Sequence, residues 1–451
     1  MTETVELESE VRTLLDQGDL EAAVEFINNR HPAEIGGVID ELDAEPAYAL
    51  FDQLDRRTQA RILPYMQPTH QLKMVQHLGR HTQARLLTDM NADERADLYQ
   101  ELPGDVQEAL MPALAKAERE DLLRLTSYPE GTVGSVMTSE YATVPAHISA
   151  RQAIERLRLQ ALNKETIYVA YVLDTERHLL GIVTLSGLVV ASPGDSVEDL
   201  MQTEVVNVHT DAPSAEAARL IADYDLLALP VVDDEERMVG IVTHDDAMDV
   251  QEAEATEDIH KGASVGDLPG SLKQTALTTL YQKRILWLVL LVFANVFSGA
   301  SISLYEETIQ AHVGLVFFLP LLIASAGNAG SQSATLMVRA IATGDVISRD
   351  WFRMLLREIG LGLMLGLTMA AAVAAIGLYR GGIELAHVVS LTMVIVVLSG
   401  SLIGMSLPFV LNKLNMDPAT ASAPVVSFIA DVAGILVYFS LASALLSIPA
   451  Q

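Results

Sequence analysis

Apolar residues recur every twelve positions between residues 20 and 125. One column of this repeat runs through Val38, Leu50 and Ile62 to Leu122, and a second apolar residue directly follows each member. A third apolar position comes four residues after the first, which puts the three side chains on one face of a helix. Prolines and polar breaks limit each helix to about two turns. One short helix cannot bury its own face, so we predict that residues 1–130 form an all-α superhelix of stacked helices.

Residues 131–250 contain an internal duplication with strand and helix patterns in the same order. The sequence SVMT at 135–138 is matched by DLMQ at 199–202, and GIVT at 181–184 recurs at 240–243. Each copy is typical of a strand, an amphipathic helix, two further strands and a last helix. The duplicated unit resembles tandem CBS domains, which are α/β regulatory modules and not enzymes.

The CBS resemblance implies that adenine nucleotides are candidate ligands of this pair. Such pairs use a Thr and an Asp three residues later to hold the ribose. The second copy has Thr243 and Asp246 at these positions, whereas the first has Thr184 followed by Gly187. We therefore expect no ribose-binding carboxylate in the first copy, and ATP remains an open possibility at the second.

The pattern changes again near residue 276, where long apolar runs begin. Runs of about 20 apolar residues are long enough to cross a bilayer as helices. We predict a domain of five membrane-spanning helices over residues 276–451. The spans expected are 284–304, 313–338, 354–379, 387–411 and 421–447.

One carboxylate, Asp431, lies near the middle of the fifth span. An ionised Asp facing lipid there would cost at least about 2.5–3.5 kcal/mol. A protonated or hydrogen-bonded packing Asp is one explanation, and a cation pathway is the other. The second span carries glycines and amides at 325–333, and we predict that this stretch interrupts the helix. With Pro424 bending the fifth span, Asn328, Gln332 and Asp431 would line a water-filled path.

Charge is distributed very unevenly. Residues 1–270 hold 51 acidic and 20 basic residues, a net charge of −31, and residues 271–451 hold 8 and 9, a net charge of +1. The acidity argues against nucleic acid as a partner and favours attraction of cations, although adaptation to a salty cytoplasm could contribute. There is no cysteine, which excludes disulfides, thiol catalysis and Cys-bound metals.

Carboxylates are dense where the CBS pair meets the first span. We predict a connecting helix over 251–275, preceded by further acids. Spacings of three and four place several carboxylates on one face, where they repel unless a cation lies between them. Oxygen ligands without His or Cys suit Mg²⁺ or Ca²⁺, while a solvated acidic helix is the alternative.

Basic residues around the spans predict the orientation. All but one of them, Arg380, fall on the same side as the N-terminal region. The positive-inside rule then puts the N-terminus in the cytoplasm and the C-terminus outside, in a multi-pass protein of the cell (inner) membrane.

Taken in order, these regions resemble the MgtE family of magnesium channels and transporters. The motifs are GNAGSQSATL at 327–336, RAIATGD at 339–345, DPA at 417–419, DVAG at 431–434 and EATEDIH at 254–260. The resemblance implies a homodimer, with Asp431 as the selectivity carboxylate and Asp417 at the cytoplasmic mouth of the pore.

The resemblance also implies a magnesium sensor in the acidic half. Bound Mg²⁺ would hold the connecting (plug) helices over the pore, and loss of Mg²⁺ would open it. The sensing carboxylates expected are Asp225, Asp246, Asp249, Glu254, Glu257 and Asp258, with Asp93 and Asp97 as partners on the superhelix.

Three other functions are weighed against this one. The chain could transport Ca²⁺, Co²⁺ or Mn²⁺, although the spans hold no Cys and only peripheral His. It could be a membrane-tethered nucleotide sensor without transport, but an anchor needs no Asp431. An enzyme is the least favoured, because we find no nucleophile–base arrangement, P-loop or metal-hydrolase spacing.

Overall fold

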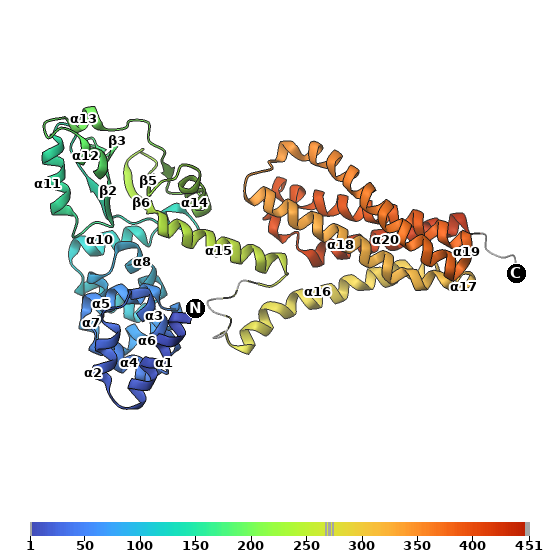
Figure 1. Cartoon of the computed structure of the whole chain (residues 1–451), viewed down its shortest axis with the longest axis horizontal. Helices are drawn as coiled ribbons and strands as arrows, with labels where there is room; N and C mark the ends of the chain where they lie inside the picture. Colours follow the sequence, from blue (N-terminus) through green and yellow to red (C-terminus); the bar gives the residue numbers. More distant parts are fainter. Residues whose placement is uncertain (1, 267, 269–271, 273–274, 447–451) are drawn as a thin grey trace. The chain divides into compact units, whose positions relative to one another are not determined.

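A computed structural model of the chain describes residues 2–266, 268, 272 and 275–446 (Figure 1). The molecule divides into two compact units, residues 1–254 and 255–451. The first contains the helical repeat and both CBS copies, and the second contains the long apolar helices.

The repeat forms short helices, as the twelve-residue period predicts. Its first apolar column is buried from Val38 to Leu122. Alternate helices pack on one another, α3 on α5 on α7 on α9 and α6 on α8 on α10, so the stack has two rows. The helices are α1 (Thr2–Asp16), α2 (Leu20–Ile27), α3 (Pro32–Glu41), α4 (Ala44–Gln53), α5 (Arg56–Ile62), α6 (Pro68–His77), α7 (Arg80–Asp89), α8 (Ala92–Glu101), α9 (Gly104–Leu110) and α10 (Lys116–Leu125).

Three glutamines spaced by 24 residues support one row of this stack. The side-chain amides of Gln59, Gln83 and Gln107 each donate to the carbonyl eight residues earlier, at distances of 2.7, 2.7 and 2.8 Å. Each bond adds a second donor to a carbonyl in the last turn of an earlier helix, where the regular helical donor is missing and the N–H three residues later already donates. The structural period is therefore two sequence repeats.

Each CBS copy forms one three-stranded sheet. In both sheets the first strand pairs parallel with the second, and the second pairs antiparallel with the third. The α/β prediction for this pair is confirmed. The elements are β1 (Tyr141–Thr143), α11 (Ala150–Gln160), β2 (Thr166–Leu173), β3 (Leu179–Thr184), α12 (Leu185–Val190), α13 (Val197–Leu200), β4 (Val208–His209), α14 (Ser214–Asp223), β5 (Ala228–Val232) and β6 (Met238–Thr243).

The second CBS copy shares its core with the helical repeat. Leu122 and Leu125 of α10 belong to the same buried cluster as Ile221 and Val242. A smaller cluster around Tyr171 joins the two CBS copies. Continuous apolar packing therefore fixes α8 and α10 relative to the sheet of the second copy, which matters for the acidic residues described below.

The connecting helix differs from its expected extent of 251–275. Helix α15 runs from His244 to Gly262, so it begins directly after β6 and ends earlier than expected. Gly262 and the Ser264 turn, with φ of +55°, end the helical hydrogen bonding. Residues 267, 269–271 and 273–274 of the expected helix lie outside the described residues.

Four helices in the described part of the second unit are long and apolar enough to cross a membrane. They are α16 (Leu277–Ser303), α18 (Gly314–Ala342), α19 (Trp351–Lys413) and α20 (Ala423–Leu445), with the short α17 (Glu306–Ala311) after the first. Helix α19 has 63 residues and breaks at Gly382, whose φ of +75° and ψ of −169° are not helical. The third and fourth expected spans are its two arms, and α16 begins earlier than expected.

The predicted interruption of the second span is wrong. Helix α18 continues through residues 325–333 without a break. Its small residues serve close packing instead: a Cβ added at Gly330 would lie 2.9 Å from the carbonyl oxygen of Gly400 in α19. Pro424 does not bend the fifth span either, because it lies in the first turn of α20, where a proline needs no hydrogen-bond partner.

Candidate functional site

Asp431 lies in α20, eight residues after Ala423, or about 12 Å along the helix. Its carboxylate faces α18. A Cβ added at Gly327 would lie 3.3 Å from Asp431 Oδ1, so a larger residue there would crowd the carboxylate. The side chain of Asp431 is half-buried between two packed helices. It is therefore not fully exposed on the outer surface of the helix bundle.

Two serines extend the polar strip on which Asp431 lies. Ser427 is one helical turn before Asp431, and its Oγ lies 3.1 Å from Ser331 Oγ of α18. The Ser331 hydroxyl also lies 3.3 Å from the Ala423 carbonyl oxygen. Sequence analysis missed both serines, although the i, i+4 spacing of Ser427 and Asp431 was a usable signal.

Asn328 and Gln332 are one turn apart on α18, and both are exposed in the single chain. Within the described part of the chain, no hydrogen bond joins either amide to Asp431. The structure therefore brings Asp431 to Gly327 and Ser427, and leaves the two amides on an open face of α18.

Asp417 precedes α20 and is held from two directions. Its Oδ1 accepts a hydrogen bond of 2.8 Å from the Ala419 N–H, and its Oδ2 accepts one of 2.5 Å from Lys261 Nζ at the end of α15. Lys261 also pairs with Glu257. Burial alone would lower the pKa of Lys261, but its bonds to Asp417 and Glu257 raise it, so it stays charged.

Asp258 lies beside the same group. Partial burial, and next the charge of Asp417, raise the pKa of Asp258 above its ordinary value. The far end of α15 therefore brings the expected residues Glu257, Asp258 and Asp417 together, with Lys261, which sequence analysis missed, in their midst.

A second group of carboxylates gathers where α8 meets the start of α15 and the first CBS copy. Asp93, Glu94 and Asp97 come from α8, Asp246 from α15, and Glu165 from the residue before β2. Among the described residues, Asp93 Oδ1 and Glu165 Oε2 are buried without a hydrogen-bond partner. We call these five residues the acidic cluster.

Every member of the acidic cluster has a raised pKa. Desolvation by the surrounding protein is the largest cause throughout, even for Asp97, whose side chain is partly exposed at the surface, and neighbouring carboxylates come next. The pKa rises to about 6 for Asp93 and Asp97, and to about 7 for Asp246. It rises to about 8 for Glu94 and Glu165, where the charge of Asp93 adds to burial. Unpartnered, mutually repelling oxygens fit a hard divalent cation.

The remaining predicted sensing residues are more dispersed. Asp225 is exposed in a turn with φ of +51°, and Asp249 is exposed on α15. Partial desolvation, and next the charge of Asp245, raise the pKa of Asp249 above its ordinary value. Glu254 is also exposed on α15. None of these three belongs to the acidic cluster.

The candidate nucleotide residues form a local hydrogen bond. The Thr243 hydroxyl donates to Asp246 Oδ2 at 2.5 Å. In the first copy, Thr184 Oγ1 accepts from the Gly187 N–H at 3.0 Å and caps α12. Asp246 thus belongs to both the acidic cluster and the possible ribose-binding pair.

The comparisons with known proteins agree with this domain order. Family models match the chain as "MgtE intracellular N domain" over residues 30–131, "CBS domain" over 133–194 and 197–253, and "Divalent cation transporter" (MgtE) over 319–441. The magnesium transporter MgtE of Thermus thermophilus is 38% identical over 436 residues, which are 96% of this chain and 97% of that protein. The chain belongs to the MgtE family of magnesium transporters.

Other MgtE proteins extend the match. The magnesium transporter MgtE of Bacillus subtilis is 33% identical over 322 residues, 71% of either chain. A crystal structure of the cytosolic domain of the Mg²⁺ channel MgtE in complex with ATP is 34% identical, with a TM-score of 0.52 over 54% of this chain and 99% of that one. A crystal structure of the soluble part of a magnesium transporter covers 56% of this chain and 99% of its own, at 28% identity and a TM-score of 0.52.

Proposed function

We propose that this chain carries Mg²⁺ across the membrane and that Asp431 selects the ion. The observation that carries the proposal is a half-buried carboxylate, flanked by Ser427 and Gly327, inside a predominantly apolar helix bundle. Mg²⁺ gives up its water reluctantly. A few oxygens that bind the hydrated ion through its waters suit it better than a cage of direct ligands.

A homodimer would complete the pathway. Asn328 and Gln332 are exposed on α18 in the single chain, as is most of α16, so much polar and apolar surface of this unit has no cover. A two-fold axis beside α18 would bring together two copies of Asp431 and of these amides. A divalent ion between two carboxylates stabilises the ionised form of both.

Transport runs inward through the cell membrane, with the N-terminus in the cytoplasm. The excess of basic residues on the N-terminal side of the spans supports this orientation. A cation then enters down its electrochemical gradient when the interior is negative. No catalytic step is part of the proposal, and ATP, if the second CBS copy binds it, acts as a modulator.

Cytosolic Mg²⁺ closes the pathway by binding the acidic residues. Glu94 and Glu165 join Asp93, Asp97 and Asp246 as ligands, because all five lie in the acidic cluster. Ions there stabilise the compact arrangement only to the extent that they bind it better than the open one. The further regulatory ligands proposed are Asp225, Asp249, Glu254, Glu257 and Asp258, with Asp417 at the mouth.

Ion uptake into proteoliposomes tests this function. Asp431→Ala and the isosteric Asp431→Asn should each reduce Mg²⁺ flux at least about tenfold, because the site loses its charge. Glu384→Gln, an exposed acid at the bend of α19, serves as the control and should leave flux unchanged. Normal flux in the Asn variant would refute the role of Asp431, and faster Co²⁺, Ca²⁺ or Mn²⁺ flux would favour another cargo.

A further inference from the structure

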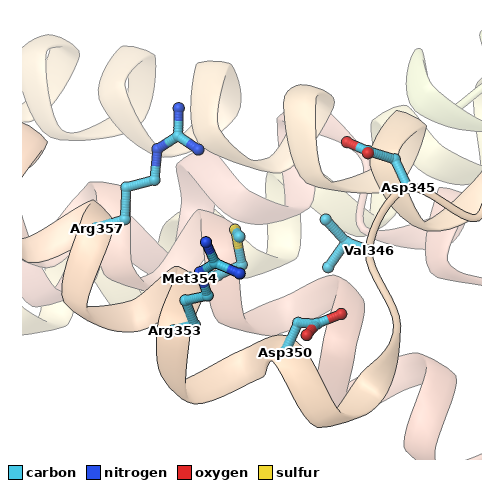
Figure 2. A pocket seen from close by; sticks show the side chains of 6 residues that line it. All are labelled: Asp345, Val346, Asp350, Arg353, Met354 and Arg357. Carbon is cyan, nitrogen blue, oxygen red and sulfur yellow. The ribbon is translucent and has the colours of Figure 1, made fainter.

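A polar cavity lies at the Arg-rich end of the membrane-spanning helices. It encloses about 240 Å³ between the turn after α18 and the first two turns of α19. This is smaller than the roughly 300–1,000 Å³ of pockets for drug-sized ligands. Figure 2 shows the guanidinium groups of Arg353 and Arg357 on one side and the carboxylates of Asp345 and Asp350 on the other.

The base of the cavity is apolar and firmly packed. Val346 is buried, and with Met354 it belongs to a cluster that includes Met405 and Phe409 of the second arm of α19. The Val346 N–H donates to the Ala340 carbonyl at 3.0 Å, and Gly344, with φ of +73°, makes the turn. The cavity is therefore preformed by the fold.

The two arginines have free hydrogen-bonding capacity. They are one helical turn apart on α19, and both are exposed. In the part of the chain that the structure describes, neither forms an ion pair, even though two carboxylates line the same cavity. A guanidinium presents a fork of donors that matches the oxygens of a phosphate.

The carboxylates limit which phosphate compounds fit. Asp350 Oδ2 accepts a hydrogen bond of 3.1 Å from the Ile347 N–H, so this carboxylate is fixed in place and has its other oxygen left to accept. Asp345 is exposed at the rim. A ligand with only anionic oxygens would be repelled on this side, whereas one with hydroxyl or ammonium donors would be bound.

The surroundings are those of a lipid headgroup site. Trp351 and Phe352 stand at the start of α19 with 39% and 63% of their surface exposed, and Leu356 follows one turn later, 57% exposed. Aromatic residues concentrate at membrane–water interfaces, and basic pockets between spanning helices bind lipid headgroups there. Acyl chains could lie along the exposed apolar face of α19.

We propose that this cavity binds the headgroup of a membrane phospholipid that carries hydrogen-bond donors besides its phosphate, such as phosphatidylglycerol or phosphatidylethanolamine. Arg353 and Arg357 hold the phosphate, and Asp345 and Asp350 accept from the hydroxyl or ammonium group. Phosphatidylcholine shares the phosphate but has no such donor, so it binds more weakly.

Native mass spectrometry of the full chain in detergent tests the proposal. Phosphatidylglycerol, phosphatidylethanolamine and phosphatidylcholine with the same acyl chains are titrated in parallel. The first two should bind about tenfold more tightly than the third, since charge-assisted hydrogen bonds are the stronger kind. Equal binding of phosphatidylcholine would overturn the donor requirement and the proposal with it.

Variants locate the binding. Arg353→Gln with Arg357→Gln should lower the affinity for both donor lipids about tenfold, to the level of phosphatidylcholine. Arg349→Gln, in the short 3-10 turn (Ser348–Asp350) directly before α19 and not among the residues that line the cavity, is the matched control and should bind like the parent chain. If the double variant does not fold, Arg357→Lys replaces it, with an intermediate loss expected because the charge stays but the fork is gone. If the double variant or Arg357→Lys binds the donor lipids as tightly as the parent chain, the cavity is not the lipid-binding site.

A soluble phosphate ester distinguishes the source of the ligand. Glycerophosphoglycerol offers the same phosphodiester and hydroxyls without acyl chains. At equal concentration it should fail to displace phosphatidylglycerol, because it lacks the contacts along α19. Displacement at equal concentration would mean that the cavity serves a soluble metabolite, and would overturn the lipid assignment.

Discussion

At the scale of single residues, the acidic cluster contains buried carboxylate oxygens that have no hydrogen-bond partner among the described residues. Glu165, directly before β2, is half-buried, its Oε2 is buried without a hydrogen-bond partner, and its pKa is raised to about 8. Near neutral pH, keeping it ionised in the folded chain is unfavourable unless a cation compensates. A neutral side chain of the same shape removes this cost and also removes a ligand.

Glu165→Gln should therefore raise the melting temperature in Mg²⁺-free buffer and reduce the further rise that Mg²⁺ produces. We expect a stabilisation on the order of 1 kcal/mol without the ion, since removing an unpaired buried charge is favourable. Thermal unfolding of the full chain with and without millimolar Mg²⁺ measures both effects. Glu198→Gln, an exposed acid of the same CBS copy, should change neither. A lower melting temperature without Mg²⁺ would contradict the account.

The same raised pKa values predict a pH dependence. A carboxyl group whose pKa is higher in the folded state contributes stability that is fully present below its unfolded pKa, near 4, and is lost as pH rises through the folded pKa. For the acidic cluster, that loss begins near pH 4 and is complete by about pH 8, because the folded pKa values lie between about 6 and 8. Without Mg²⁺, stability of this unit should fall across the window.

Mg²⁺ competes with protons for these oxygens, so its effect should have the opposite trend. The Mg²⁺-induced rise in melting temperature should be small at pH 5.5 and large at pH 8.5. Binding near pH 7 should also release protons, which a dye in weakly buffered solution reports. An Mg²⁺ effect independent of pH would exclude the acidic cluster as the binding site.

At the scale of helices, glycine sets how closely α18 and α19 approach. A Cβ at Gly404 would collide with the Gly330 carbonyl oxygen, whereas a Cβ at Gly360 of the same helix would meet nothing within 4 Å. Gly404→Ala should therefore destabilise the membrane unit by about 1–3 kcal/mol or more, because backbone must move. Gly360→Ala should be neutral or slightly stabilising. Melting temperature and the yield of monodisperse protein distinguish the two, and equal behaviour would contradict this packing.

Lys261 joins the end of α15, through Asp417, to the short turn that precedes α20. If α15 keeps the pathway closed, Lys261→Gln should weaken closure and move inhibition by Mg²⁺ to severalfold higher concentration, since one charged hydrogen bond of the closed state is lost. Lys413→Gln, an exposed lysine at the end of α19, is the control. Flux into proteoliposomes at stepwise Mg²⁺ concentrations measures the shift, and an unchanged midpoint would remove Lys261 from the gate.

Sequence predicted these elements unevenly, for physical reasons. The burial of one face of each helix leaves a pattern in the local sequence, so the period of twelve predicts the short helices. The 24-residue spacing of Gln59, Gln83 and Gln107, in contrast, depends on how the two rows of helices stack. Composition alone does not distinguish a helix break from close packing, so the glycines at 327 and 330 predict a break where the structure has a tight helix contact. Asp93, Asp97 and Asp246 were predicted together by resemblance. Glu165 was missed because only tertiary packing brings it to α8.

At the scale of the whole molecule, the chain couples an acidic unit to an almost neutral membrane unit. The acidic unit can regulate transport only if Mg²⁺ binding favours one of its arrangements over another. Under the proposed function, repulsion within the acidic cluster would supply that preference, because the five carboxylates of α8, α15 and the first CBS copy repel one another unless they are protonated or bound to a cation.

Neutralising the cluster should therefore separate regulation from transport. Asp93→Asn, Asp97→Asn and Asp246→Asn combined leave Asp431 untouched, so flux through the pathway should persist while its inhibition by Mg²⁺ on the N-terminal side is lost or moved at least about tenfold higher. A truncation lacking residues 1–270 should show the same insensitivity, and the two are compared in proteoliposomes with Mg²⁺ varied on that side alone. If the triple variant folds normally but loses flux, these carboxylates belong to the conduction path itself. If Mg²⁺ inhibits the triple variant as strongly as the intact chain, Mg²⁺ is sensed elsewhere.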